Sequence, residues 1–298
     1  MTRQTAGGIP IACAFAPSHM TGFFALGMGT SYGAGITLSK GCATECRALA
    51  GKPGKAVFRI NGKLVKKHET RVSRLVLRKF ALLFPAFFKS NSLSIAHSHD
   101  FPCGFGMGSS ASAALSLSLA LNRLLGSPLS RAKAVKIAAE ADLECGCGVL
   151  GVYASATGGF LAKKSPKSAV SRLLAQRGCT LLFGFLSPIS TKAVLGNKKT
   201  MESIGRAGAP AAKEFFKAPT LYNLALVSNR FAIDSGIAKG KAKKLLLADR
   251  QCGMAMLGNT FFWVFPDMQS ALLARKHYAK QFKKMELCSP SEKGAMLA

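Results

Sequence analysis

Hydrophobic residues in the first half of the chain occur in short runs separated by glycines, a pattern that predicts strands joined by tight turns. The runs expected to be strands are residues 12–15, 36–38, 45–48, 57–60 and 93–96. Asn61-Gly62 follows one of these runs and precedes a second apolar pair at residues 64–65. Because Asn-Gly favours the left-handed backbone of a two-residue turn, these two segments are expected to pair as a hairpin.

Longer segments of the first half have the apolar spacing of helices, namely residues 73–88, 111–125 and 130–144. Pro85 is expected to interrupt the first of these helices. The second is apolar along nearly its whole length, which predicts a helix that is buried on most sides. Ser130 stands where the third helix would need an N-cap.

The pattern changes after Gly158-Gly159, where a second group of elements begins. Apolar runs that predict strands lie at residues 160–161, 170–174, 180–185 and 256–264. Helical spacing begins at residues 192–195 and continues in two further segments, 222–236 and 241–253. The chain shows no internal repeat, so we expect two interlocking α+β lobes, residues 1–160 and 161–298.

The composition is that of a globular protein with a sizeable core, since 49% of the 298 residues are hydrophobic. No stretch offers the roughly 20 uninterrupted apolar residues that cross a bilayer. The apolar stretch at residues 9–29 lacks the basic flank of a signal peptide, so we expect a cytoplasmic protein. Nine cysteines are dispersed, and Cys145 and Cys147 lack the two-residue gap of a zinc knuckle, which favours reduced thiols.

The charge balance is strongly basic, with 41 Lys and Arg against 13 Asp and Glu and a formal net charge of +28. Such a field attracts nucleic acid, anionic membranes and anionic metabolites. The basic residues are nevertheless scattered in small groups, without the aromatic motif, zinc finger or basic heptads of nucleic-acid-binding proteins. The sequence therefore does not favour nucleic acid as a partner, and a basic solvated surface is the simpler interpretation.

The most informative stretch is Gly-Phe-Gly-Met-Gly-Ser-Ser-Ala-Ser at residues 104–112, which opens directly into the apolar helix. A glycine-rich turn at a helix N-terminus directs several backbone N–H groups at one point, a geometry that suits phosphate. The hydroxyls of Ser109 and Ser110 are candidate ligands for the Mg²⁺ that accompanies ATP. The stretch is neither a Walker loop nor a dinucleotide fingerprint, and close packing alone is the alternative explanation.

In this stretch the chain resembles the phosphate-binding motif of the GHMP kinase superfamily, and more narrowly it resembles the archaeal pantoate kinases. The segments that carry the resemblance follow the family order along the chain: residues 16–24, 31–35, 104–112, 187–192, 219–238 and 254–260. The resemblance implies a two-lobed α+β fold, with an N-terminal lobe like ribosomal protein S5 domain 2 and a ferredoxin-like C-terminal lobe. It also implies ATP-dependent phosphorylation of pantoate to 4-phosphopantoate on the route to coenzyme A.

The resemblance further implies roles for particular residues. Those that match the ATP-binding loop are Gly104, Gly106, Gly108, Ser109, Ser110 and Ala111. Ser110 and Glu140 match the pair that holds Mg²⁺ and serves catalysis, although a solvated charge on a helix face is the alternative for Glu140. The residues expected to bind the acceptor are His19, Thr21, Asn229, Arg230, Gly258 and Asn259.

Three departures from the family pattern stand out. Ser18 replaces a glycine, which would strain the backbone if its φ were positive. Tyr32 replaces an arginine, and with it a cation that could contact a carboxylate. Gly151 or Val152 stands where the family has the aspartate that acts as base, and Asp142, on the preceding helix, is the only carboxylate close by.

Loss of a general base commonly costs about 10²–10⁴-fold in rate. We therefore expect an active or weakly active pantoate kinase. The alternatives are another small-molecule kinase of the superfamily and a non-catalytic nucleotide-binding homologue. The sequence leaves a homodimer open.

Overall fold

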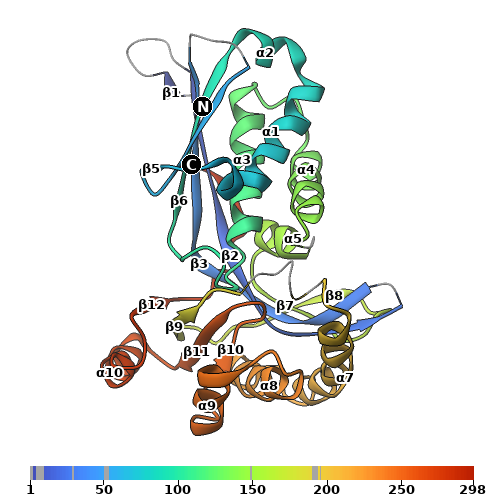
Figure 1. Cartoon of the computed structure of the whole chain (residues 1–298), viewed down its shortest axis with the longest axis vertical. Coiled ribbons are helices and arrows are strands. Elements are labelled where there is room, and N and C mark those ends of the chain that lie inside the picture. The colour runs from blue at the N-terminus through green and yellow to red at the C-terminus, as the bar shows by residue number, and fades with distance from the viewer. Residues whose placement is uncertain are drawn as a thin grey trace.

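The computed structural model describes residues 3–4, 10–28, 30–49, 54–147, 150–189, 194 and 196–298. Two long antiparallel strands, β2 (Pro10–Gly27) and β3 (Thr30–Leu49), run through both halves of the molecule (Figure 1). The sequence pattern marks only short parts of them as strands. Pairing between β2 and β3 shifts register near Pro17 and again near Thr21, so the apolar alternation is broken where the strands pass from one half to the other.

The upper half of these strands belongs to a mixed sheet. There β3 pairs antiparallel with β6 (Ser92–His99), which pairs parallel with β4 (Ala56–Ile60). The expected hairpin at Asn61-Gly62 is confirmed, because β4 pairs with β5 (Lys63–Leu64). In this upper half the short strands β1 (Arg3–Gln4) and β13 (Met296–Leu297) both pair with β2.

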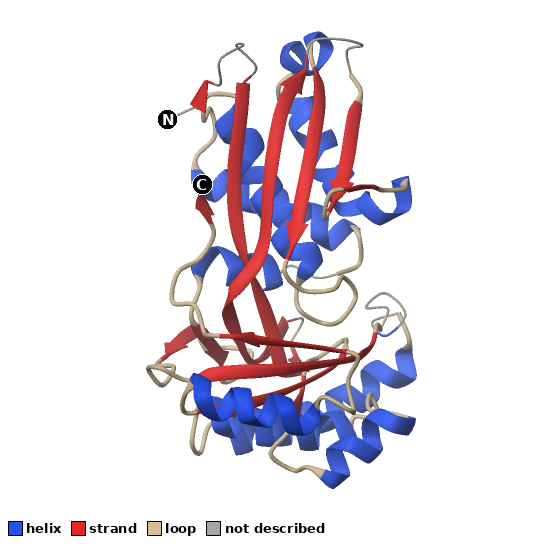
Figure 2. Ribbon diagram, turned by 90° about the vertical axis from the view of Figure 1, so that its left-hand side faces the viewer, coloured by secondary structure: helices blue, strands red, loops and turns tan. Residues whose placement is uncertain are grey.

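Helices cover one face of this part of the sheet (Figures 1 and 2). They are the short 3-10 helix η1 (Lys67–Thr70), α1 (Arg71–Leu83), α2 (Pro85–Ser90), α3 (Ser109–Leu124), α4 (Arg131–Glu144) and α5 (Leu150–Thr157). Nearly every residue of α3 is buried, because α3 contacts β2 and β3 on one side and α1, α4 and α5 on the others. The prediction of a helix buried on most sides is thereby confirmed. Ser130 caps α4 as expected, accepting a hydrogen bond from the Lys133 N–H.

In the lower half, β3 pairs with β7 (Phe160–Lys163), and β7 pairs with β8 (Val170–Leu173). A separate antiparallel sheet has the strand order β10 (Gly253–Met254), β11 (Asn259–Phe265), β9 (Thr180–Ser187) and β12 (Lys284–Cys288). The helices of this half are α7 (Lys198–Phe215), α8 (Leu221–Asp234), α9 (Gly240–Ala248) and α10 (Met268–Tyr278). The division expected at residue 160 therefore falls inside the larger sheet, since β7 and β8 continue it.

The expected α+β fold is confirmed. The sequence pattern does not predict α5, α10 or β12, and two of the elements that it does predict have other bounds. The helix expected at residues 241–253 ends at Ala248, and the strand expected at 256–264 is interrupted at Leu257, whose φ of +61° is left-handed. The helix start expected at residues 192–195 lies largely outside the described residues, as does part of the segment at 187–192. Within the described ranges, every helix is too short or too polar to span a bilayer.

Candidate active site at the glycine-rich loop

The glycine-rich loop has a backbone that ordinary side chains rarely adopt. Gly104, Gly106 and Gly108 have φ values of +83°, +77° and +65°, all in the left-handed region. A Cβ on Gly106 would stand 2.6 Å from the carbonyl oxygen of Met256, and one on Gly108 would stand 2.8 Å from that of His19. The glycines are therefore required both by the turn and by close approach from two sides.

Segments far apart in the sequence hold this loop in place. The Thr260 hydroxyl donates to the carbonyl of Phe105 at 2.6 Å, and the Ile189 N–H donates to the carbonyl of Gly104 at 3.0 Å. The Met256 N–H donates to the carbonyl of Thr21 at 2.8 Å, which joins the same segment to β2. Three of the segments that carry the family resemblance, which contain Thr21, Ile189 and Thr260, thus meet around the glycine-rich loop.

Ser110, in the first turn of α3, donates its hydroxyl hydrogen bond to the carboxylate of Asp142 on α4. Asp142 is only 2% exposed, and this burial raises the pKa of its carboxyl from 3.8 to about 6, while the bond from Ser110 partly opposes the rise. The pair lies at the start of α3, where the first backbone N–H groups have no acceptor within the helix. A buried carboxylate and a hydroxyl are oxygen donors of the kind that Mg²⁺ accepts.

Glu140 is not part of this arrangement, which corrects the expectation from the sequence. Its carboxylate lies 3.4 Å from the ammonium of Lys79 and 4.0 Å from that of Lys136, and its side chain is 44% exposed. Residues two apart on a helix point about 200° away from each other. When Asp142 faces α3, Glu140 must therefore face outward, and the structure does not bring it to Ser110.

The α8 residues expected to bind the acceptor have other partners, a second correction. The buried Asn229 side-chain amide donates to the carbonyls of Leu246, Asp249 and Cys252 at 3.0, 3.1 and 2.7 Å, and so ties α8 to the end of α9. Arg230 is exposed on the outside, 3.9 Å from Glu214. Both side chains serve the C-terminal lobe and lie away from the loop.

Gly258 and Asn259 border the glycine-rich loop. A Cβ on Gly258 would come within 2.0 Å of the carbonyl oxygen of Phe105, so this glycine is needed for packing against the loop. The Asn259 amide donates to the Ser187 hydroxyl at 2.7 Å. The buried side-chain oxygen of Asn259 has no hydrogen-bond partner within the described part of the chain.

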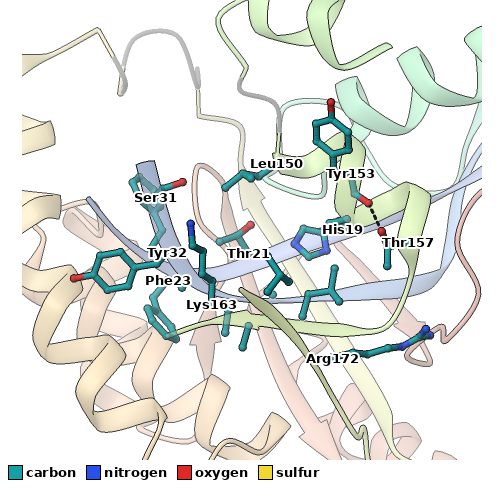
Figure 3. A pocket seen from close by; sticks show the side chains of 18 residues that line it. His19, Thr21, Phe23, Ser31, Tyr32, Leu150, Tyr153, Thr157, Lys163 and Arg172 are labelled. Carbon is teal, nitrogen blue, oxygen red and sulfur yellow. Dashed lines mark hydrogen bonds between the residues drawn. The ribbon is translucent and has the colours of Figure 1, made fainter. Parts of the chain in front are cut away.

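A cavity of about 320 Å³ opens next to the loop, between β2, β3, β7 and α5. The expected residues His19 and Thr21 line it, and Figure 3 shows them beside Lys163 along one wall. Burial lowers the pKa of His19 to about 4, so its ring is neutral at pH 7. The ammonium of Lys163 donates to the Thr30 hydroxyl at 3.3 Å and has no ion pair within the described ranges.

The structure also shows where the residues that depart from the expected family pattern lie. The φ of Ser18 is not positive, so the strain considered for this position does not arise. Gly151 lies in the first turn of α5, where a Cβ would stand 3.2 Å from that of Ala111, next to Ser110. Val152 is fully buried in the core. Of the two candidate positions for the missing carboxylate, Gly151 is the one beside the loop.

Part of the chain is similar in sequence to known kinases. Residues 70–159 match the family model described as "GHMP kinases N terminal domain". A pantoate kinase of Methanocaldococcus jannaschii is 28% identical over 261 residues, which cover 84% of this chain and 91% of the relative.

Solved structures agree in fold. A phosphotransferase related to the coenzyme A biosynthesis pathway superposes with a TM-score of 0.80 at 23% identity, covering 97% of this chain and 98% of the other. Homoserine kinase from Cytophaga hutchinsonii gives 0.66 at 16% identity, with both chains fully covered. Mevalonate diphosphate decarboxylase from Enterococcus faecalis gives 0.67 at 15% identity, covering 97% and 99%.

Proposed function

We propose that the chain is a small-molecule kinase, because residues 70–159 match the N-terminal domain of GHMP kinases and the fold matches that of a solved phosphotransferase. The reaction we assign is transfer of the γ-phosphoryl group of ATP to a hydroxyl of pantoate, which yields 4-phosphopantoate and ADP. The observation that carries the proposal is the Ser110–Asp142 pair at the end of the glycine-rich loop, next to a cavity that Lys163 and Arg172 line. The similarity to a pantoate kinase supports the choice of acceptor.

The ATP phosphates are proposed to lie against the loop and the start of α3. Backbone N–H groups of Gly104, Gly106, Gly108 and residues 109–111 would donate to the phosphate oxygens, helped by the helix dipole. The rigid backing of the loop by Thr260 and Ile189 means that little reorganisation is needed when the nucleotide binds. Phosphoryl transfer depends mainly on such positioning and on neutralisation of charge.

Ser110 and Asp142 are the residues that fit a bound Mg²⁺. Asp142 is a buried carboxylate that, among the described residues, accepts a side-chain hydrogen bond from Ser110 alone. No three His, Cys, Asp or Glu residues cluster as a metal site in the described ranges, so the triphosphate would complete the ligand set. When bound, the ion would neutralise charge on the phosphate oxygens.

The acceptor is proposed to occupy the cavity beside the loop. Lys163 is placed to pair with the carboxylate of a small hydroxy acid, because its ammonium lines the cavity and has no acidic partner among the described residues. Arg172 also borders the cavity, but it is held by Glu292 at 2.9 Å. Thr21 and the neutral His19 would hydrogen-bond the acceptor hydroxyls.

The site lacks a carboxylate at Gly151, and the mechanism must work without one. Phosphoryl transfer proceeds through a loose transition state in which the attacking hydroxyl loses its proton late. Correct placement of the hydroxyl therefore supplies much of the acceleration. We assign the proton to an oxygen of the transferred phosphoryl group as the new O–P bond forms.

The acceptor assignment is tested by ADP release from ATP and Mg²⁺ with D-pantoate, mevalonate, homoserine and shikimate supplied separately. The proposal expects turnover with pantoate and at least tenfold less with the others. Turnover with another acceptor would place the chain in a sister activity. The second candidate, a non-catalytic nucleotide-binding protein, is favoured by Gly151 and would show stabilisation by ATP without ADP release.

A further inference from the structure

A second cavity, of about 440 Å³, shares Tyr32 with the acceptor cavity and has a different character. We name it the lysine cavity, after the three lysines among the residues that define it. Those residues include Tyr32, Lys164, Ser165, Lys213, Phe216 and Lys217. None of the loop residues 104–111 lines it, so it is separate from the site proposed for ATP.

The three ammonium groups come from two parts of the fold. Lys164 follows β7, whereas Lys213 lies in the last turn of α7 and Lys217 lies just beyond that helix. Cations are favoured near a helix C-terminus, which accounts for Lys213 and Lys217 without any ligand. It does not account for Lys164, which the fold brings to the same cavity from the larger sheet.

The charge of the lysine cavity is only partly balanced. Lys217 pairs with Glu214 at 2.8 Å, one helical turn away. Among the described residues, Lys164 and Lys213 have neither an ion pair nor a hydrogen bond through the side chain. Like charges around one cavity repel each other, so a bound anion would stabilise the arrangement.

Tyr32 forms a wall shared by the two cavities, because its side chain lines both. Figure 3 shows its hydroxyl directed away from Lys163, Thr21 and His19. The ring is packed close to the Gly27 backbone, with Cε1 3.6 Å from the position of a Cβ there. Tyr32 therefore lines both cavities, with its hydroxyl directed away from the polar residues of the acceptor cavity.

We propose that the lysine cavity binds a phosphorylated small molecule and that its occupancy alters acceptor binding through Tyr32. Lysine ammonium groups serve as point charges for phosphate, and the Tyr32 and Ser165 hydroxyls add neutral donors. Phe216 and the neighbouring alanines supply an apolar surface for the rest of the ligand. The effect on the acceptor rests on the proposed function, whereas the binding itself does not.

The binding is tested by calorimetric titration of inorganic pyrophosphate into the protein saturated with Mg²⁺ and AMPPCP, at constant free Mg²⁺. Occupation of the loop by the nucleotide analogue leaves the lysine cavity as the site under test. We expect one site whose Kd rises at least tenfold in a K213Q/K217Q double variant. A K89Q/K241Q double variant removes the same charge from exposed lysines elsewhere and should change the Kd less than threefold.

Absence of saturable binding would overturn the proposal, as would equal weakening in both double variants, which would show a general effect of the basic charge. The role of Tyr32 is tested in the kinase assay, where pyrophosphate should change the half-saturating acceptor concentration in the wild type. The same change should be lost in K213Q/K217Q. An unchanged acceptor response despite binding would refute the coupling, and a lack of turnover would leave the calorimetric result standing.

Discussion

Replacement of Asp142 by asparagine is expected to make the metal-free protein more stable at neutral pH. Burial raises the pKa of this carboxyl from 3.8 to about 6. Because the folded state binds this proton more tightly than the unfolded state, stability is lost as the pH rises from about 4 to about 6. At 1.36 kcal/mol per pKa unit, the ionised carboxylate costs about 3 kcal/mol above pH 7, about 1.5 kcal/mol at pH 5 and almost nothing below pH 4.

Asparagine keeps the shape of the side chain and an oxygen that can accept the Ser110 hydrogen bond, but it never ionises. Thermal unfolding in EDTA should therefore show a gain of roughly 5 °C for D142N at pH 8, at about 2 °C per kcal/mol for a chain of this size. The gain should be about half as large at pH 5. Addition of ATP and Mg²⁺ should stabilise the wild type more than D142N, because the variant lacks the carboxylate ligand.

The matched control is E140Q, which changes a carboxylate two residues away on the same helix. Glu140 is exposed and paired with lysines, so its substitution should alter stability by about 0.5 kcal/mol or less at either pH. A D142N variant no more stable than the wild type at pH 8, or a gain that is the same at both pH values, would refute the reasoning.

Three further substitutions test separate parts of the account. G106A should abolish ATP binding in calorimetry, because a Cβ would meet the Met256 carbonyl at 2.6 Å and the φ of +77° disfavours alanine. An unchanged affinity for ATP would argue against this loop as the nucleotide site. K163M should raise the half-saturating pantoate concentration roughly 10–100-fold, because the loss of a charged hydrogen bond costs about 1.5–3 kcal/mol. The half-saturating ATP concentration should stay unchanged. N229L should lower the thermal midpoint by removing the donor to three buried carbonyls, at a cost of about 2–3 kcal/mol, while the acceptor response of the folded fraction stays the same.

The parts of the molecule that could be predicted from the sequence are those governed by local chemistry. The glycines at 104, 106 and 108 and the apolar run after them indicate a turn that opens into a buried helix, and all three adopt positive φ before α3. Asn61-Gly62 and Ser130 act through their own backbone preferences, and the structure places them in a hairpin and at an N-cap. None of these features depends on a distant partner.

The choice between Glu140 and Asp142 of α4 could not be made this way. Glu140 and Asp142 are both polar residues in a helix of alternating character, and only the packing of α4 on α3 decides which of them is buried. The family resemblance favours Glu140, whereas the structure buries Asp142 beside Ser110. The same limit applies to Asn229, whose three carbonyl partners lie 17 to 23 residues further along the chain.

The sequence alone does not indicate a role for Lys163, because the position of this side chain depends on strand register. Gly33 pairs with Lys163 when β7 joins β3, and this places the ammonium near Thr30 and along the wall of the acceptor cavity. A one-residue shift would turn it to the other face of the sheet. Only the assembled sheet shows that a cation stands beside Tyr32, the position at which the family resemblance predicts an arginine.

The central claim is that Ser110 and Asp142, and not Glu140, serve phosphoryl transfer from ATP. The most direct measurement is the Mg²⁺-dependent rate of ADP release with D-pantoate for the wild type, D142N and E140Q, each shown to be folded. The account predicts that D142N loses at least about 10²-fold in kcat/KM, the several kcal/mol expected of lost metal-assisted charge neutralisation, while E140Q stays within threefold of the wild type. The reverse order of the two variants, or full activity in D142N, would contradict it.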